Sequence, residues 1–258
     1  MATLNITREN SVTYIYLNRP EKFNSFNREM AMALNTILKE AEQDENCRCV
    51  VISGTGKAFS AGQDLAEAID PKGPSILHIV TQHYNPIIKL IRTLKKPVIA
   101  AVNGVAAGAG ANIALCCDIV LASENASFIQ AFSKIGLIPD SGGTYFLPRL
   151  IGFQRASALM MTGDKLSAYE ALQIGLVYKV FPANTFETDT KQFAETIAQM
   201  PTAALVATKS LLNQSYHNNL EDQLEAEAHY QNKLSTSYDY QEGVNAFLEK
   251  RQPQFKGK

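Results

Sequence analysis

Two short apolar runs constrain the fold of this 258-residue chain more than any other feature. They are RCVVIS at Arg48–Ser53 and KPVIAAVN at Lys96–Asn103, each with a continuous apolar centre. Strands of this composition are typical of parallel sheets that are buried on both faces. A helical stretch at about Ser75–Leu94 lies between the two runs. The alternation of strand and helix predicts a parallel sheet packed by helices.

The flanking segments extend the same α/β pattern. The first ten residues and Ser11–Asn18 alternate between apolar and polar side chains, which is typical of strands. Asn27 is placed to cap a helix that runs to about Asp44 and has one apolar face. Two further strands are expected at Asp118–Ala122 and Ala126–Ile129.

The chain changes character after about Gly152. The remainder favours helices, with one short strand candidate at Val177–Phe181. We therefore predict an α/β core domain over residues 1–195 and a C-terminal helical region over residues 196–258.

Charge and cysteine content limit the partners that we expect. The net charge of −1 gives no electrostatic reason to expect a nucleic acid or a membrane surface. No apolar run approaches the roughly 18 residues of a membrane span, and the first residues do not resemble a signal peptide. Cys47, Cys49, Cys116 and Cys117 lack the second ligand pair of a zinc site, so they are expected to fill the core. We expect a reduced, cytoplasmic protein without a metal.

Two loops rich in small residues, Gly56–Leu65 and Asn103–Asn112, follow the two buried runs. Small side chains allow backbone N–H groups to point at a ligand, and a helix that begins at such a turn adds partial positive charge. A dinucleotide-binding loop does not match, because the third glycine and the later acidic residue are missing. Tight packing of helix on sheet and an anion hole built from one amide of each loop remain as alternatives.

Nucleophilic catalysis by a triad is not favoured. Ser60 lacks the G-x-S-x-G elbow. The four histidines lie on expected helices, where solvated or packed side chains are the simpler interpretation: His78, His83, His217 and His229.

Asp140 is an isolated carboxylate in the apolar and glycine-rich stretch FSKIGLIPDSGGTYFLPR, residues 132–149. One interpretation is a cap on a helix that opens at Ser141-Gly142-Gly143. The other is a catalytic acid or base in an apolar pocket. Apolar walls raise the pKa of a carboxyl group and a helix start lowers it, so the direction of the pKa shift of Asp140 stays open at this point.

Several motifs in order resemble the crotonase (enoyl-CoA hydratase/isomerase) family, over essentially the whole chain. They are LNRP at Leu17–Pro20 with Asn24 and Ser25, FSAGQDL at Phe59–Leu65, KPVIAAVNG at Lys96–Gly104, and TGD at Thr162–Asp164 with Ala171 and GLV at Gly175–Val177. The stretch around Asp140 and the ending EGVNAFLEKRQPQFKGK are similar to the isomerase branch associated with phenylacetate degradation.

The resemblance implies a fold of repeated ββα units, a (ββα)n spiral core, and a C-terminal helical region for trimerisation. It also implies acyl-CoA substrates and homotrimers that often pair into hexamers. Two backbone amides, those of Gln63 and Ala109 by motif, would hold the thioester oxygen and stabilise an enolate. Only the backbone of Gln63 would then matter, together with the small size of Ala109.

The chain departs from the hydratase pattern of this family. Hydratases use two glutamates to position and split water, and the matching positions here are Asn112 and Phe132. Neither side chain does general acid/base work; Asn112 would orient a polar group and Phe132 would exclude water. The resemblance to family isomerases places a catalytic carboxylate at Asp140. We therefore expect an acyl-CoA isomerase without a cofactor, since CoA is part of the substrate. Hydration, a double-bond shift, hydrolysis and CoA binding without turnover remain alternatives.

Binding of the CoA moiety is expected to involve further residues that match the family's motifs. Lys22 and Phe23 would lie near the nucleotide, although Lys22 is equally consistent with an ordinary surface lysine. Lys250 and Arg251 near the C-terminus would either contact a phosphate across a subunit interface or simply stabilise the C-terminal end of a helix through their positive charge. The pantetheine side would be lined by the segment after the first amide: Asp64, Leu65 and Ala66.

Overall fold

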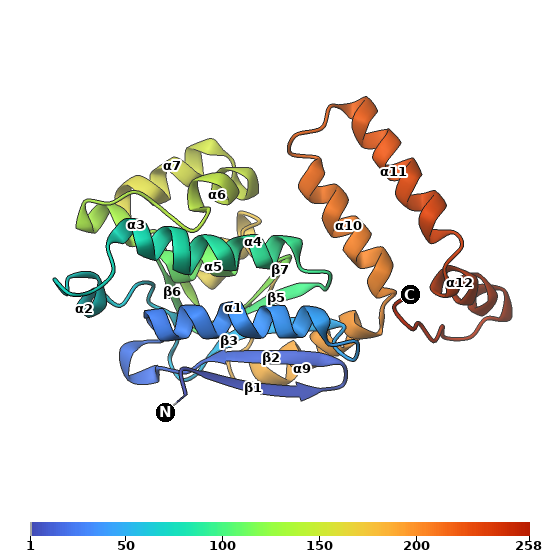
Figure 1. Ribbon diagram of the computed structural model, residues 1–258, viewed down its shortest axis with the longest axis horizontal. Coiled ribbons are helices and arrows are strands. Elements are labelled where there is room, and N and C mark those ends of the chain that lie inside the picture. Colours follow the sequence, from blue (N-terminus) through green and yellow to red (C-terminus); the bar gives the residue numbers. More distant parts are fainter. Residues whose placement is uncertain (1) are drawn as a thin grey trace.

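The computed structural model describes residues 2–258 and contains two sheets surrounded by helices (Figure 1). The larger sheet has the order β1-β2-β3-β5-β7-β10 and is parallel except for the hairpin of its first two strands. Its strands are β1 (Leu4–Glu9), β2 (Val12–Leu17), β3 (Cys49–Gly54), β5 (Val98–Val102), β7 (Ile119–Ser123) and β10 (Lys179–Phe181). The predicted parallel sheet is confirmed.

A second, smaller sheet lies beside the first and has the order β4-β6-β8-β9. Its strands are β4 (Ala58–Ser60), β6 (Val105–Ala107), β8 (Ser127–Ile129) and β9 (Lys165–Ser167). Three strands of the large sheet (β3, β5 and β7) are each followed by one strand of the small sheet and then by helical structure. This is the repeated ββα arrangement that was expected, and it places short strands inside both glycine-bearing loops.

Helices cover both faces of the large sheet. The larger core includes α1 (Arg28–Gln43), α4 (Asn85–Thr93) and α5 (Ala109–Leu115), and α9 (Phe186–Gln199) packs on the other face. Along β3, Val50 and Ile52 point into the first core and Cys49 and Val51 into the second. Burial on both faces explains why this strand shows no polar alternation. All four cysteines are buried free thiols, as expected for core filler.

The cap and the boundaries predicted for the first helix agree with the structure. The Asn27 side chain accepts a hydrogen bond from the Met30 amide and begins α1. The stretch expected at Ser75–Leu94 is helical throughout, but a π-helical segment interrupts it. Its parts are α3 (Ile76–His78), η2 (Ile79–Tyr84) and α4. A π segment inside a helix is frequently found at a functional site.

The remaining helices lie around the small sheet and at the C-terminal end. The first group is η1 (Pro20–Lys22), α2 (Leu65–Ala68), η3 (Ala131–Ile135), α6 (Gly143–Ile151), α7 (Phe153–Thr162) and α8 (Ala168–Gln173). The second is α10 (Thr202–Gln214), α11 (Leu220–Leu234) and α12 (Tyr238–Glu249), which stand apart from the sheets (Figure 1). The predicted division between residues 195 and 196 falls inside α9, whose Ala198 is still part of the core. Within residues 2–258, no helix has the length and apolar character needed to cross a membrane.

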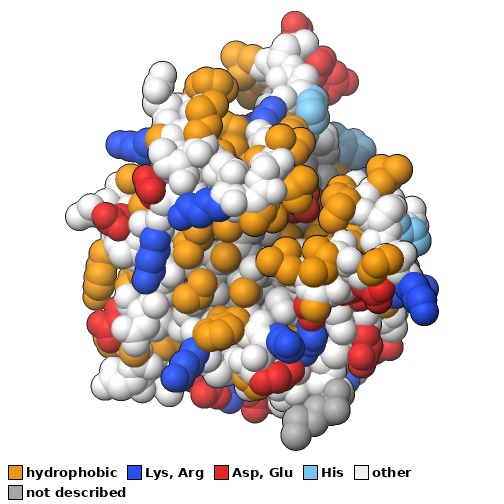
Figure 2. Space-filling model, turned by 90° about the vertical axis from the view of Figure 1, so that its left-hand side faces the viewer, with side chains coloured by type: hydrophobic (Ala, Val, Ile, Leu, Met, Phe, Trp, Pro, Cys, Tyr) orange, Lys and Arg blue, Asp and Glu red, His pale blue; other side chains and the backbone are white. Residues whose placement is uncertain are grey.

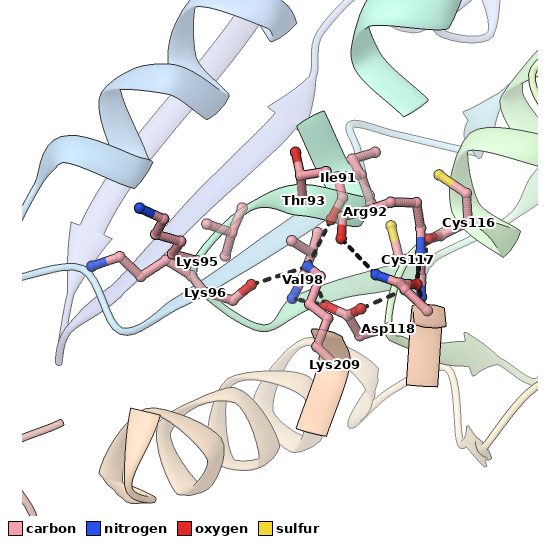
Figure 3. A network of polar contacts seen from close by, with 12 residues as sticks. Ile91, Arg92, Thr93, Lys95, Lys96, Val98, Cys116, Cys117, Asp118 and Lys209 are labelled. Atoms are coloured by element: carbon pink, nitrogen blue, oxygen red, sulfur yellow. Dashed lines mark hydrogen bonds and ion pairs between the residues drawn. The ribbon is translucent and has the colours of Figure 1, made fainter. Parts of the chain in front are cut away.

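A network of buried polar contacts attaches α10 to the core (Figure 3). Lys209 is 7% exposed; its Nζ lies 2.8 Å from Asp118 Oδ2 and donates to the carbonyl oxygen of Ile91 at 2.6 Å. Asp118 also accepts from Arg92 at 3.3 Å and from the Val98 amide at 2.8 Å. One carboxylate thus joins the tail helix to α4 and to the start of β5.

We expect Lys209→Met to lower the free energy of unfolding by about 3 kcal/mol, because it leaves a largely buried carboxylate short of one cation. Lys191→Met is the matched control. Lys191 pairs with Glu9 at 3.2 Å, but the two side chains are 36% and 44% exposed, so we expect less than about 1 kcal/mol. Urea unfolding of both variants measures the difference. Equal losses would contradict the anchoring role of Lys209.

Candidate active site

Two backbone amides from separate loops come close together at the edge of the small sheet. They belong to Gln63, which follows β4, and to Ala109, the first residue of α5. Neither N–H has a hydrogen-bond acceptor among residues 2–258. A free amide at a helix start is a ready site for an anionic oxygen.

Gly62 makes the close approach of these loops possible. Its φ is +91°, and a Cβ added there would lie 2.9 Å from the Ala107 carbonyl oxygen and 3.4 Å from the Ala109 nitrogen. An L-residue would be strained and would push the second loop away. The segment is also fixed by Phe26, whose amide donates to the Gly62 carbonyl at 2.7 Å and whose carbonyl accepts from Asp64 at 2.8 Å.

Asp140 is held near Ala109 through its backbone. Asn112, one turn further along α5, donates from Nδ2 to the Asp140 carbonyl oxygen at 2.9 Å. Gln130 donates to Asn112 Oδ1 at 2.8 Å and fixes the orientation of that amide. A Cβ at Gly143 would lie 2.4 Å from Asn112 Nδ2, so only glycine fits beside this contact. Asn112 thus orients a polar group.

The Asp140 side chain caps no helix, which removes the alternative interpretation of this residue. The N-cap position of α6 is Gly142, with φ +75°, and no side chain accepts from the first turn. The Asp140 carboxylate accepts from Ser141 Oγ at 2.9 Å. Burial raises the pKa of Asp140, while the Ser141 hydroxyl opposes that shift. A carboxyl group with a raised pKa is suited to giving back the proton that it takes.

Phe132 contributes an apolar wall to the same region. It is buried in η3, and its ring lies 3.7 Å from where a Cβ of Gly108 would be, just before the Ala109 amide. The position carries no acid or base. At the two positions that match the hydratase glutamates, Asn112 therefore holds the backbone of the Asp140 loop and Phe132 supplies an apolar ring.

Asp64 forms part of the loop's own structure. Its carboxylate accepts from Arg19 at 2.7 Å and from the Ala66 amide at 3.1 Å. Burial opposes ionisation, but the Arg19 hydrogen bond and charge outweigh it, and the pKa of Asp64 is lowered. With both oxygens engaged, Asp64 shapes the first loop. Its side chain has little capacity left for a ligand.

The other residues expected to bind CoA are exposed. Phe23 is 55% exposed and its carbonyl accepts from the Ala61 amide at 2.9 Å, so it lies beside the first loop. Lys22 and Ala66 are exposed, and Leu65 is 55% exposed. Lys250 follows α12, at the other end of the molecule from α2 (Figure 1), and is not brought to this site within one chain. Arg251 is engaged by Glu242 and Glu249.

The face at the α2 end of the molecule is apolar at its centre. Figure 2 shows hydrophobic side chains gathered around a hollowed area, with most charged groups towards the margin. Exposed apolar residues in the segments around the two loops and Asp140 include Ile69, Leu77, Leu137 and Ile138. An apolar acyl group would be accepted more readily here than a charged one.

Sequence patterns did not identify Tyr84, Ser141 or Glu67 as parts of this site. Tyr84 donates to the Gln63 side chain at 2.6 Å, and Gln63 in turn donates to Glu67 at 3.2 Å. The expectation that only the backbone of Gln63 matters is therefore incomplete, because its amide group is hydrogen bonded at both ends. Ser141 adopts a positive φ of +51°. The amino-acid sequence around it does not predict this backbone conformation.

Comparisons with known proteins agree on one family. Residues 7–258 match the family described as enoyl-CoA hydratase/isomerase. The 1,2-epoxyphenylacetyl-CoA isomerase of Escherichia coli (strain K12) is 47% identical over 97% of each chain. The 2,3-dehydroadipyl-CoA hydratase of the same organism is 36% identical over the full length of both. The crystal structure of an enoyl-CoA hydratase from Bacillus anthracis superposes with a TM-score of 0.92 at 34% identity, covering 99% of this chain and all of that one.

We expect Asp140→Asn to melt at or above the wild type at pH 7.5. Because burial raises the pKa of Asp140, its charged form destabilises the fold above that pKa, and the penalty disappears as the pH falls through the ordinary carboxyl range. The advantage of the variant should therefore shrink towards pH 4 in thermal melts.

Asp64→Asn is the matched control, with the opposite sign. Its lowered pKa means that the carboxylate stabilises the fold at neutral pH, so the variant should lose about 1–2 kcal/mol there. That loss should also fade in acid. A comparable loss for Asp140→Asn at pH 7.5 would show that the Asp140 carboxylate anchors its loop.

Proposed function

We propose that this chain, which belongs to the enoyl-CoA hydratase/isomerase family, is an acyl-CoA isomerase with Asp140 as its proton shuttle. It is an enzyme that acts on acyl-CoA thioesters. The finer proposal is isomerisation of 2-(1,2-epoxy-1,2-dihydrophenyl)acetyl-CoA or a closely similar aromatic acyl-CoA. The epoxyphenylacetyl-CoA isomerase similar to this chain supports that choice of substrate.

One observation carries the proposal of isomerisation. Asp140 has a carboxyl group whose pKa is raised by burial, and its backbone is bound to Asn112 on the helix that begins at the free Ala109 amide, while the positions Asn112 and Phe132 provide no second acid or base. Hydration needs groups that position and split a water molecule. Moving a proton within the substrate needs one base that returns what it takes.

The proposed mechanism begins with the thioester oxygen between the N–H groups of Gln63 and Ala109. Asp140 removes the alpha proton, and the negative charge develops on that oxygen. Two preorganised donors lower the energy of such an oxyanion by several kcal/mol. The Asp140 carboxyl group then returns the proton at another carbon of the conjugated system.

The same steps serve two kinds of substrate. With an epoxyphenylacetyl thioester they accompany expansion of the ring to an oxepin. With a simple unsaturated acyl group they move a double bond. In both cases the product is an isomer of the substrate, so the proposed reaction needs no redox partner and no added water. The apolar side chains around the site, among them Ile138 at 79% exposure, suit an acyl group without charge.

The expected consequence is that Asp140→Asn binds acyl-CoA but loses exchange of the alpha proton with deuterated water. An amide has no useful basicity, and loss of general base catalysis typically costs about 100- to 10,000-fold in rate. Asp222→Asn, an exposed carboxylate on α11, is the control and should exchange normally.

A panel of acyl-CoA thioesters identifies the reaction of the wild type. Each thioester is assayed for isomerisation, for water addition and, as a test of the hydrolase alternative, for halide release. Crotonyl-CoA hydration by the wild type at rates ordinary for an enzyme, roughly 1–1000 per second, would contradict isomerisation as its only activity.

We further propose that the chain assembles as a homotrimer or as a hexamer of two trimers. Beyond α10, which is attached to the core, α11 and α12 stand apart from the sheets (Figure 1) and expose several large apolar side chains. Among them are Leu220 at 75%, Phe247 at 83% and Leu248 at 71% exposure. A mainly apolar hollow of about 430 Å³ lies between α10 and α12. Contiguous exposed apolar surface of this kind is characteristic of subunit contacts.

Light scattering at micromolar concentration should give the mass of three or six chains. Phe247→Asp should reduce that mass, because it places a charge in the exposed apolar surface. Lys39→Asp on α1, exposed and outside that surface, should leave it unchanged. A wild-type mass equal to one chain would overturn the proposed assembly.

A further inference from the structure

The Gln63 side chain is hydrogen bonded at both ends of its amide group. Tyr84 Oη donates to Gln63 Oε1 at 2.6 Å. Gln63 Nε2 donates to Glu67 Oε2 at 3.2 Å and to the Asp64 carbonyl oxygen at 3.2 Å. A side chain held in this way restricts rotation about the backbone of its own residue.

The groups that hold Gln63 are themselves fixed. Tyr84 is 1% exposed, and its ring packs edge-on against Phe26 with centroids 5.9 Å apart. It ends the π-helical segment η2, just before α4, which has a proline in its first turn. Glu67 accepts from the Arg28 amide at the start of α1, at 2.9 and 3.1 Å. The helical segments that carry Tyr84 and Glu67, η2 and α2, thus both hold the Gln63 side chain.

The backbone around Gln63 needs this support. Phe26 holds the Gly62 carbonyl, which shares one planar peptide unit with the Gln63 N–H, and it also holds the Asp64 amide. Gly62 itself has φ +91° and no side chain that could make a further contact. Phe26 thus fixes the carbonyl end of this peptide unit, and the contacts of the Gln63 side chain fix its other end, at the Gln63 Cα.

We propose that Tyr84 is a positioning residue that sets the direction of the Gln63 N–H through the Gln63 side chain. This inference rests on the proposed function, in which that N–H binds the thioester oxygen. Without the Tyr84 hydroxyl, Gln63 turns more freely and its N–H meets the oxygen at a poorer angle. Hydrogen bonds weaken steeply with misalignment, so the developing charge is less stabilised.

Tyr84→Phe tests the proposal, because it keeps the ring and its contact with Phe26 and removes only the hydroxyl. The readout is the absorption band of bound cinnamoyl-CoA, whose conjugated carbonyl shifts to longer wavelength when amides polarise it. We expect a smaller red shift than in the wild type, with the dissociation constant changed less than about threefold. In turnover, kcat should fall about tenfold, less than the 100- to 1000-fold typical of losing a whole donor.

Two further variants separate positioning from general damage. Gln63→Leu removes the acceptor of the Tyr84 hydroxyl together with the donor to Glu67, and should reduce the red shift at least as much as Tyr84→Phe. Adding Tyr84→Phe to Gln63→Leu should have no further effect. Tyr14→Phe removes another buried tyrosine hydroxyl, one without a hydrogen-bond partner among residues 2–258 and on the other face of the sheet. It should leave the band and kcat unchanged.

The outcomes distinguish the positioning role from the proposed reaction. A full red shift in Tyr84→Phe overturns the positioning role, and so does the absence of any shift in the wild type. A wild-type shift that Tyr84→Phe reduces, in a protein that isomerises no thioester of the panel, supports positioning and refutes the isomerase.

Discussion

The close approach of two backbone segments, at Gly62 and at Ala107–Ala109, is the constraint on which the rest of the site depends. A side chain at Gly62 would press on the Ala107 carbonyl oxygen and on the Ala109 amide and would push the second loop away from the first. The requirement explains why the strands that lead into the crossing are short and are followed by small residues. It also explains why the supporting contacts come from outside the loops, through Phe26 and Tyr84.

Asp140 shows how a carboxylate is positioned without being neutralised. Asn112 holds the Asp140 backbone, so the loop is fixed, while the side chain accepts from the Ser141 hydroxyl and from its own backbone amide. Had a cation or several amides held the carboxylate, its pKa would be lowered, as that of Asp64 is beside Arg19. Burial raises the pKa of Asp140 at a cost in stability. Packing and networks such as that around Asp118 and Lys209 offset this cost elsewhere.

Sequence patterns predicted the large sheet because its strands are long enough to show continuous apolar character on both faces. They did not predict β4 and β6, which lie inside loops rich in glycine and alanine, or β9, in which Leu166 is the one apolar residue. Asp140 could be singled out because an isolated acid is a local signal, and Gln63 and Ala109 because their glycine-bearing loops resemble the family's motifs. Tyr84 could not, because its role depends on a π-helical turn and on contact with a loop 21 positions earlier. The boundary expected at residue 195 falls inside α9, because α9 and α10 are both helical in sequence character and only packing tells them apart.

Two sets of exposed apolar residues lie at different ends of the molecule. One includes Ile69 and Leu77 near the site, and the other includes Phe247 and Leu248 on α12, at the opposite end of the molecule (Figure 1). A two-fold dimer pairs a surface with itself and would cover one group only. A contact between the two different ends is heterologous, and heterologous contacts form either closed rings or open filaments. The closed ring of the proposed trimer would cover both groups with a single type of contact. Under that proposal, the Lys250 of one chain would lie towards the α2 end of the next chain, where the sequence resemblance expects a CoA phosphate.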